Sequence, residues 1–109
     1  MTITKNLSER LSIEEASKLR KELNDLLDRG ENTFIINFRD CQFIDSTGLG
    51  VVVASFRRCL QQNGNLILCC IKNPQVQEIL ALTRLDRVFT IYATYEDALK
   101  AYENHSGTG

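Results

Sequence analysis

Two short apolar runs constrain the fold of this chain more than any other feature. They cover residues 33–38 (TFIINF) and 66–71 (LILCCI), and polar or turn-forming residues bound both of them. Nearly continuous apolar runs of this length are typical of strands that are covered on both faces. A segment with helical periodicity lies between them, and a strand, a helix and a second buried strand form a parallel βαβ unit. The sequence therefore predicts an α/β fold.

Further elements follow from periodicity and capping signals. Helices are predicted over residues 13–29, from near Thr47 to about 62, in a shorter segment from Pro74, and from about 95 to Glu103. Ser12 with Glu15, and Thr94 with Asp97, fit N-terminal capping patterns. Strands are predicted over residues 2–7, at an edge of the sheet, and 88–92. The sum is one small, mostly parallel sheet of about four strands with about four helices packed against it.

The 109 residues suffice for one hydrophobic core and therefore for a single domain. We expect the domain to span residues 1–103 and the polar residues 104–109 to form a flexible tail. The sequence does not decide between a monomer and a dimer, although an open edge strand at residues 2–7 could pair with a second copy.

Charge and composition exclude several classes of partner and site. The formal net charge of -1, the isoelectric point near 5.8 and the scattered arginines predict neither nucleic acid nor an anionic membrane as a partner. No apolar segment approaches the roughly 20 residues that cross a bilayer, and the amino end has no apolar signal sequence, so we expect a cytoplasmic protein. The four cysteines form no C-x-x-C pair and lie far in sequence from His105, the only histidine, which favours free thiols over a metal or redox site.

The stretch from Phe43 to Gly50 joins a short polar connection to the second predicted helix. An apolar stripe starts that helix near Thr47 and places Ser46 at its amino end; the stripe is Leu49, Val52, Val53, Phe56, Cys59 and Leu60. The first turn of a helix has unpaired N–H groups and the positive end of the helix dipole, which favour a serine oxygen, a carboxylate or a phosphate. Gly48 and Gly50 remove side chains from this turn, which would let another protein approach the Ser46 hydroxyl.

Two roles for Ser46 remain open on these grounds: an ordinary N-cap, or a regulatory serine that receives a phosphoryl group. Asp45 beside it is interpreted as a cap rather than as an acid or base. No histidine lies near Ser46 in the sequence, and the patterns G-x-S-x-G, G-x-x-x-x-G-K-[ST] and G-x-G-x-x-G are missing, so we predict no catalytic residues and no cofactor. Nucleotide binding at the strand ends rests on architecture alone.

Residues 37–50 (NFRDCQFIDSTGLG) resemble the signature of the STAS domain, and specifically of bacterial anti-sigma factor antagonists. The resemblance extends from Leu11 to the last helix. It implies partner switching: the antagonist binds an anti-sigma factor that is also a serine kinase, this kinase phosphorylates the serine after the aspartate, and a serine phosphatase reverses the modification. Carried over, Ser46 is the phosphorylation site and Asp45 lies beside it. The remaining residues of the partner-binding turn are Thr47, Gly48, Leu49 and Gly50.

The chain departs from the family pattern at two places. Family members commonly have another strand ahead of the one predicted at residues 2–7, and Ser12 stands where the family often has aspartate. Related members act on targets other than sigma factors. The main alternative is a constitutive STAS-like adaptor subunit of a larger complex, such as a lipid-transport ATPase, in which Ser46 is never modified.

Overall fold

The computed structural model describes residues 1–107, with side chains described up to Glu103. A parallel sheet has the strand order β1-β3-β5-β6. Its strands are β1 (Ile3–Asn6), β3 (Thr33–Asn37), β5 (Asn65–Cys69) and β6 (Ile91–Tyr92). The helices are α1 (Ile13–Asp28), α2 (Ser46–Gln61), α3 (Pro74–Leu82) and α4 (Tyr95–Gly107). The predicted class, an α/β domain with about four parallel strands and about four helices, is confirmed.

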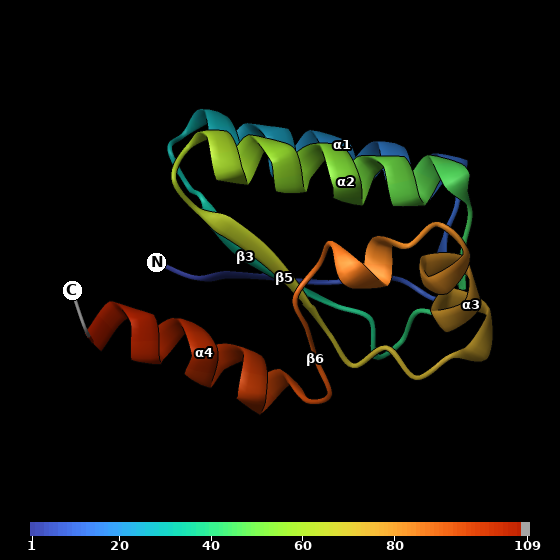
Figure 1. Cartoon of the computed structure of the whole chain (residues 1–109). Helices are drawn as coiled ribbons and strands as arrows, with labels where there is room; N and C mark the ends of the chain where they lie inside the picture. Colours follow the sequence, from blue (N-terminus) through green and yellow to red (C-terminus); the bar gives the residue numbers. More distant parts are fainter. Residues whose placement is uncertain (108–109) are drawn as a thin grey trace.

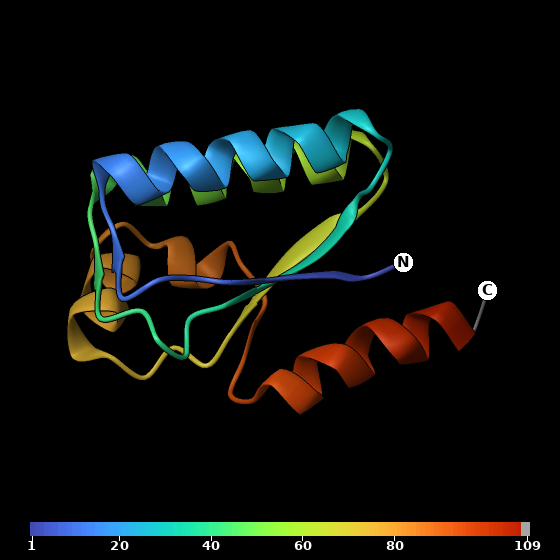
Figure 2. The ribbon, with the colours of Figure 1, turned by 180° about the vertical axis from the view of Figure 1, so that it is seen from behind.

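The helices cover the two faces of the sheet unequally. In Figures 1 and 2, α1 and α2 lie side by side over one face, whereas α4 lies on the opposite face. Successive residues of a strand point to opposite faces, and β3 follows this rule: Phe34 and Ile36 belong to the larger core under α1 and α2, and Ile35 belongs to the smaller core under α4. The central strands are therefore buried on both faces, as their apolar composition predicts.

A second, two-stranded parallel ribbon was not predicted. Strand β2 (Arg10–Leu11) pairs with β4 (Phe43–Ile44), with Leu11 opposite Ile44 in the register. The guanidinium carbon of Arg10 lies 4.3 Å from the centre of the Phe43 ring, a cation–π contact that spans the ribbon. Each strand leads directly into a helix, so the ribbon brings the amino ends of α1 and α2 together.

Several element ends differ from the prediction. Ser12 is the N-cap residue of α1, but its side chain makes no capping hydrogen bond, so the predicted capping box is wrong. Strand β5 ends at Cys69 because Cys70 has a positive φ of 62°. The predicted strand 88–92 is shorter because Val88 and Phe89 still donate backbone hydrogen bonds to the Leu85 carbonyl and so close the 3-10 turn η1 (Leu85–Arg87).

The last helix is longer than predicted. The Thr94 hydroxyl accepts a hydrogen bond from the Asp97 N–H at 3.1 Å, as the capping pattern indicated. Helix α4 continues past Glu103 to Gly107, so the predicted tail begins with helical backbone; residues 108–109 lie outside the described part of the chain.

The buried face of α2 also differs from the predicted stripe. Leu60 is 50% exposed and Val53 is only half-buried, whereas Val51 and Ser55 are buried. The reason is that α2 packs against two neighbours, the sheet below it and α1 beside it. Its buried surface is therefore wider than a stripe facing the sheet alone.

The four cysteines are free and buried. Burial raises the pKa of the Cys59 thiol to about 11 and that of Cys69 to about 12, and it also raises the pKa of Cys41. Thiolates are the reactive form, so the thiols of Cys41, Cys59 and Cys69 are protected both by packing and by their raised pKa values, while Cys70 is protected by burial.

We predict that the native thiols react with Ellman's reagent at pH 8 at least roughly 100-fold more slowly than those of the urea-unfolded protein, because reaction requires opening of the core. Release of the coloured thiolate measures both rates. Rapid modification of a thiol without loss of the folded circular dichroism spectrum would contradict this description of the core.

Candidate functional site: the turn at the start of α2

Asp45, not Ser46, caps helix α2. Asp45 has extended backbone angles, φ -110° and ψ -175°, and its Oδ1 accepts a hydrogen bond from the Gly48 N–H at 3.0 Å. Its carbonyl oxygen accepts from the Leu49 N–H at 2.9 Å. The interpretation of Asp45 as a cap is confirmed, and the alternative in which Ser46 is the cap is wrong. Ser46 is the first helical residue, one position earlier than the predicted start near Thr47.

The hydroxyl of Ser46 is therefore not needed to hold the helix. Ser46 and Thr47 are both exposed, and neither side chain makes a hydrogen bond within the described part of the chain. Ser46 lies in the first turn, where backbone N–H groups lack partners inside the helix and the helix dipole favours negative charge. A phosphoryl group on this hydroxyl would be stabilised by the helix dipole and, because Ser46 is exposed, would not have to displace packed side chains.

The two glycines of the turn have different roles. A Cβ atom on Gly48 would lie 2.3 Å from the carbonyl oxygen of Leu11 and 2.8 Å from its Cγ, so this glycine is required where α2 packs on β2. A Cβ on Gly50 would have nothing within 4 Å, and Gly50 is exposed. The expectation that both glycines leave the turn open is wrong for Gly48, which is buried; Gly50 lies in open space, and the approach of a partner there stays a prediction.

Gln75 of α3 holds the strand that leads into the turn. Its Nε2 donates to the Ile44 carbonyl at 3.0 Å, and its Oε1 accepts from the Ile44 N–H at 3.1 Å. The side-chain amide thus pairs with β4 as a neighbouring strand would. Asn73 caps α3 by accepting from the Gln75 N–H at 2.9 Å, which fixes the helix end that carries Gln75. Sequence reasoning missed Gln75, because no local pattern connects it to a strand 31 residues away.

Among the described residues, no side chain is hydrogen-bonded to the Ser46 hydroxyl as a general base would be, and the carboxylate of Asp45 accepts a hydrogen bond from the Gly48 N–H. The side chain of His105 lies outside the described residues. Within the described range, no group of three or more His, Cys, Asp or Glu side chains could hold a metal ion. None of the helices formed by these residues is both long and apolar enough to cross a membrane. What the turn offers chemically is an exposed hydroxyl on a rigid, capped helix end.

Comparison with known proteins identifies the family to which this chain belongs. The sequence profile of the STAS domain matches residues 3–98, a range that contains the whole turn and every strand of the sheet. The chain belongs to the STAS domain family. The resemblance noted in residues 37–50 is confirmed, and the turn described above is the start of the second helix of a STAS domain.

Individual relatives agree with this assignment. A candidate anti-sigma factor antagonist of Thermotoga maritima is 33% identical over 91 residues, which cover 83% of this chain and 80% of the relative. The anti-sigma F factor antagonist of Paenibacillus polymyxa is 26% identical over 98 residues, covering 89% and 83% of the two chains. A crystal structure of a candidate anti-sigma factor antagonist from Thermotoga maritima matches this STAS domain with a TM-score of 0.80 and 32% identity, over 90% of this chain and 86% of the other.

The two glycines provide a matched test of the turn. We predict that Gly48→Ala lowers the free energy of unfolding by about 3 kcal/mol, because the new methyl group overlaps a backbone carbonyl. Gly50→Ala is expected to raise it by about 0.5 kcal/mol, since alanine is a better helix former and meets open space. Urea denaturation of both variants measures the difference. Equal effects would mean that α2 does not approach β2 this closely.

A second pair of variants tests the amide contact. We predict that Gln75→Ala lowers the free energy of unfolding by about 2 kcal/mol, because both backbone polar groups of the buried Ile44 lose their partner. Gln77→Ala, on the exposed side of the same helix, is the control and is expected to cost less than about 0.5 kcal/mol. Similar losses in the two variants would show that the contact does not support β4.

Proposed function

We propose that this STAS domain is an anti-sigma factor antagonist that works by partner switching. The unphosphorylated form binds an anti-sigma factor that is also a serine kinase, and the kinase phosphorylates Ser46, which releases the domain. A serine phosphatase acting on phospho-Ser46 restores binding. The partner-binding turn consists of Asp45, Ser46, Thr47, Gly48, Leu49 and Gly50, with Gly48 contributing through packing rather than contact.

One observation carries the proposal: Ser46 is exposed at the first position of a helix that another residue caps. Its hydroxyl is free for chemistry, because removing or modifying it leaves the Asp45 cap in place. The relatives described above are antagonists by name, and the STAS family match covers the turn. These observations support the role in general, and the exposed hydroxyl supports Ser46 as the residue through which it is regulated.

The energetics favour a change in affinity over a change in fold. A phosphoryl group adds about 1.5 to 2 negative charges, which a helix amino end favours by about 0.3–1 kcal/mol. At an interface the same group must be desolvated, and a penalty of about 2.8 kcal/mol there weakens binding roughly 100-fold. The same modification therefore leaves the stability of the domain nearly unchanged but lowers its affinity for the partner.

The proposal predicts a mass increase of about 80 Da, one phosphoryl group, in a fraction of the protein isolated from its own cells. Peptide mapping is expected to place it on Ser46. Ser46→Ala should lose the modification and keep partner binding, whereas Thr47→Ala, the neighbouring exposed hydroxyl, should keep both. Ser46→Asp is expected to imitate the phosphate poorly, because it carries less charge.

Two results would contradict the proposal. Modification solely at another residue would remove the role of Ser46. Unmodified protein in a stable complex with a transporter would favour the adaptor alternative, in which the turn is a constant contact. A kinase-like ATPase that copurifies with the unmodified protein and is lost on phosphorylation is the expected outcome.

A further inference from the structure

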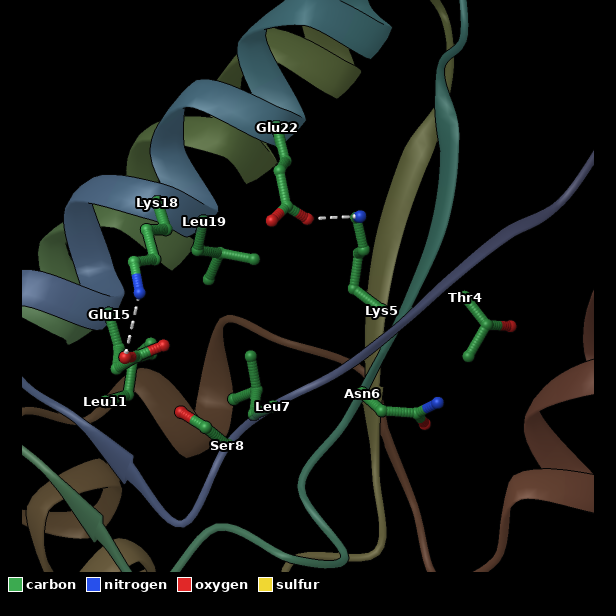
Figure 3. Close-up of a pocket in the computed structure, with 10 residues that line it drawn as sticks. All are labelled: Thr4, Lys5, Asn6, Leu7, Ser8, Leu11, Glu15, Lys18, Leu19 and Glu22. Carbon is green, nitrogen blue, oxygen red and sulfur yellow. Dashed lines mark hydrogen bonds and ion pairs between the residues drawn. The ribbon is translucent and has the colours of Figure 1, made fainter.

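Two of the hollows on the described part of the chain differ in charge balance. The first, about 320 Å³, lies between β1 and α1 (Figure 3). Its two cations are already paired, Lys5 with Glu22 and Lys18 with Glu15. The second, about 330 Å³, runs along α2 beside η1 and begins at Ser46. Its lining is Ser46, Leu49, Gly50, Val53, Ala54, Arg57 and Leu85.

We call this second hollow the α2 groove. Its apolar contacts come from Leu49, Val53 and Leu85, of which the last two are only half-buried. Gly50 and Ala54 are exposed and one helical turn apart, and neither has a side chain larger than a methyl group. Another backbone can therefore approach α2 closely along this apolar surface.

The α2 groove ends at an unpaired cation. Arg57 is exposed and makes no ion pair or hydrogen bond within the described part of the chain. Its neighbour Arg58, in contrast, donates to Asn24 at 3.1 Å and to Asp28 at 2.9 Å, which ties it to α1. Arg57 is therefore the guanidinium of α2 that remains available to a partner.

Ser46 and Arg57 mark opposite ends of the groove. They are eleven residues apart, and eleven residues of α-helix span about 16 Å. The arginine side chain cannot bridge this distance, so a phosphate on Ser46 would not be neutralised by Arg57. The groove thus has a permanent positive charge at one end and a switchable negative charge at the other.

The lining limits what can occupy the groove. An extended strand needs backbone partners, but from Leu49 to Arg57 the backbone N–H groups of α2 are paired within the helix. The volume is at the small end of the range of about 300–1,000 Å³ for ligand pockets, and one hydroxyl and one guanidinium are few groups to orient a small molecule. A helix satisfies its own backbone and needs only an apolar face and a matching charge.

We infer that the α2 groove receives an amphipathic helix of the partner, with apolar side chains on Leu49, Val53 and Leu85 and a carboxylate on Arg57. This inference rests on the proposed function, since it names the chemistry of the partner that docks at the same turn. The carboxylate at Arg57 fixes the direction of the partner helix. With the carboxylate at the amino end of the partner helix, phosphorylation of Ser46 places about two negative charges against its carboxyl end, where the helix dipole is also negative.

The test uses two stapled helical peptides of about 15 residues, long enough to span the groove. Both carry leucines along one face. At the amino end of this face one peptide has glutamate and the other has lysine, so that the carboxyl end of the peptide helix faces Ser46. In titrations of the ¹⁵N-labelled full chain, the glutamate peptide is expected to shift the amides of Gly50, Val53 and Leu85. We expect it to bind roughly 10-fold more tightly than the lysine peptide, about 1.4 kcal/mol.

Charge reversal separates a local contact from net charge. Arg57→Glu is expected to invert the preference between the two peptides. Arg20→Glu changes the net charge equally but lies on α1, outside the groove, and is expected to leave the preference intact. Thermal denaturation followed by circular dichroism verifies that both variants fold. Equal affinity for the two peptides, or shifts that map elsewhere, would overturn the inference.

A final arm keeps this inference distinct from the proposed function. Phosphoserine incorporated at position 46 is expected to weaken binding of the glutamate peptide at least roughly 10-fold. An unchanged affinity would contradict the claim that a phosphate on Ser46 weakens binding in the groove. If the protein in its own cells carries no phosphate but the preference for the glutamate peptide depends on Arg57, the proposed regulation is wrong. The inference that the α2 groove binds an acidic amphipathic helix is then still supported.

Discussion

The close approach of α2 to the Leu11 carbonyl is the constraint on which the proposed site depends. Only a glycine at position 48 allows it, and it holds the first turn of the helix flush against β2. Strand β4 is then fixed between β2 on one side and the Gln75 amide on the other. Because β4 is hydrogen-bonded on both sides up to Asp45, the backbone that leads to Ser46 is fixed in position. A partner that binds here does not have to order the turn first, which avoids an entropic cost.

The two faces of helix α2 differ in exposure. Leu49, Val52 and Cys59 are buried against the sheet and α1, whereas Ser46, Gly50 and Arg57 are exposed. The faces meet at Leu49, which is 7% exposed and contributes to both the core and the groove. If the proposed groove binds a partner, variants on the exposed face should weaken binding without unfolding the domain, whereas variants on the buried face should first lower the stability of the domain. Leu49 is the position at which the two effects are mixed.

How much could be predicted from the sequence depends on whether a feature has a local signal. The strands β3 and β5 are buried on both faces and consist of apolar residues, so their composition and the helical segment between them identify the parallel unit. Asp45 and Ser46 are adjacent and both are good N-cap residues, so periodicity cannot assign the cap to one of them. The two-residue strands of the ribbon are too short for periodicity, and the Gln75 contact joins distant parts of the chain. The candidate turn was thus located from its motif, while its support was not.

The position of Ser46 reconciles two requirements that usually conflict. A regulatory charge must be strong enough to disrupt an interface, yet a domain stable by only about 5–15 kcal/mol cannot absorb a large local penalty. At the carboxyl end of a helix, the phosphate would meet the negative end of the dipole, and inside the core it would be desolvated. At the first helical position the dipole favours it, the cap belongs to Asp45, and the side chain is exposed. Under the proposed mechanism, the full cost of a phosphate on Ser46 would therefore fall on the partner that covers it.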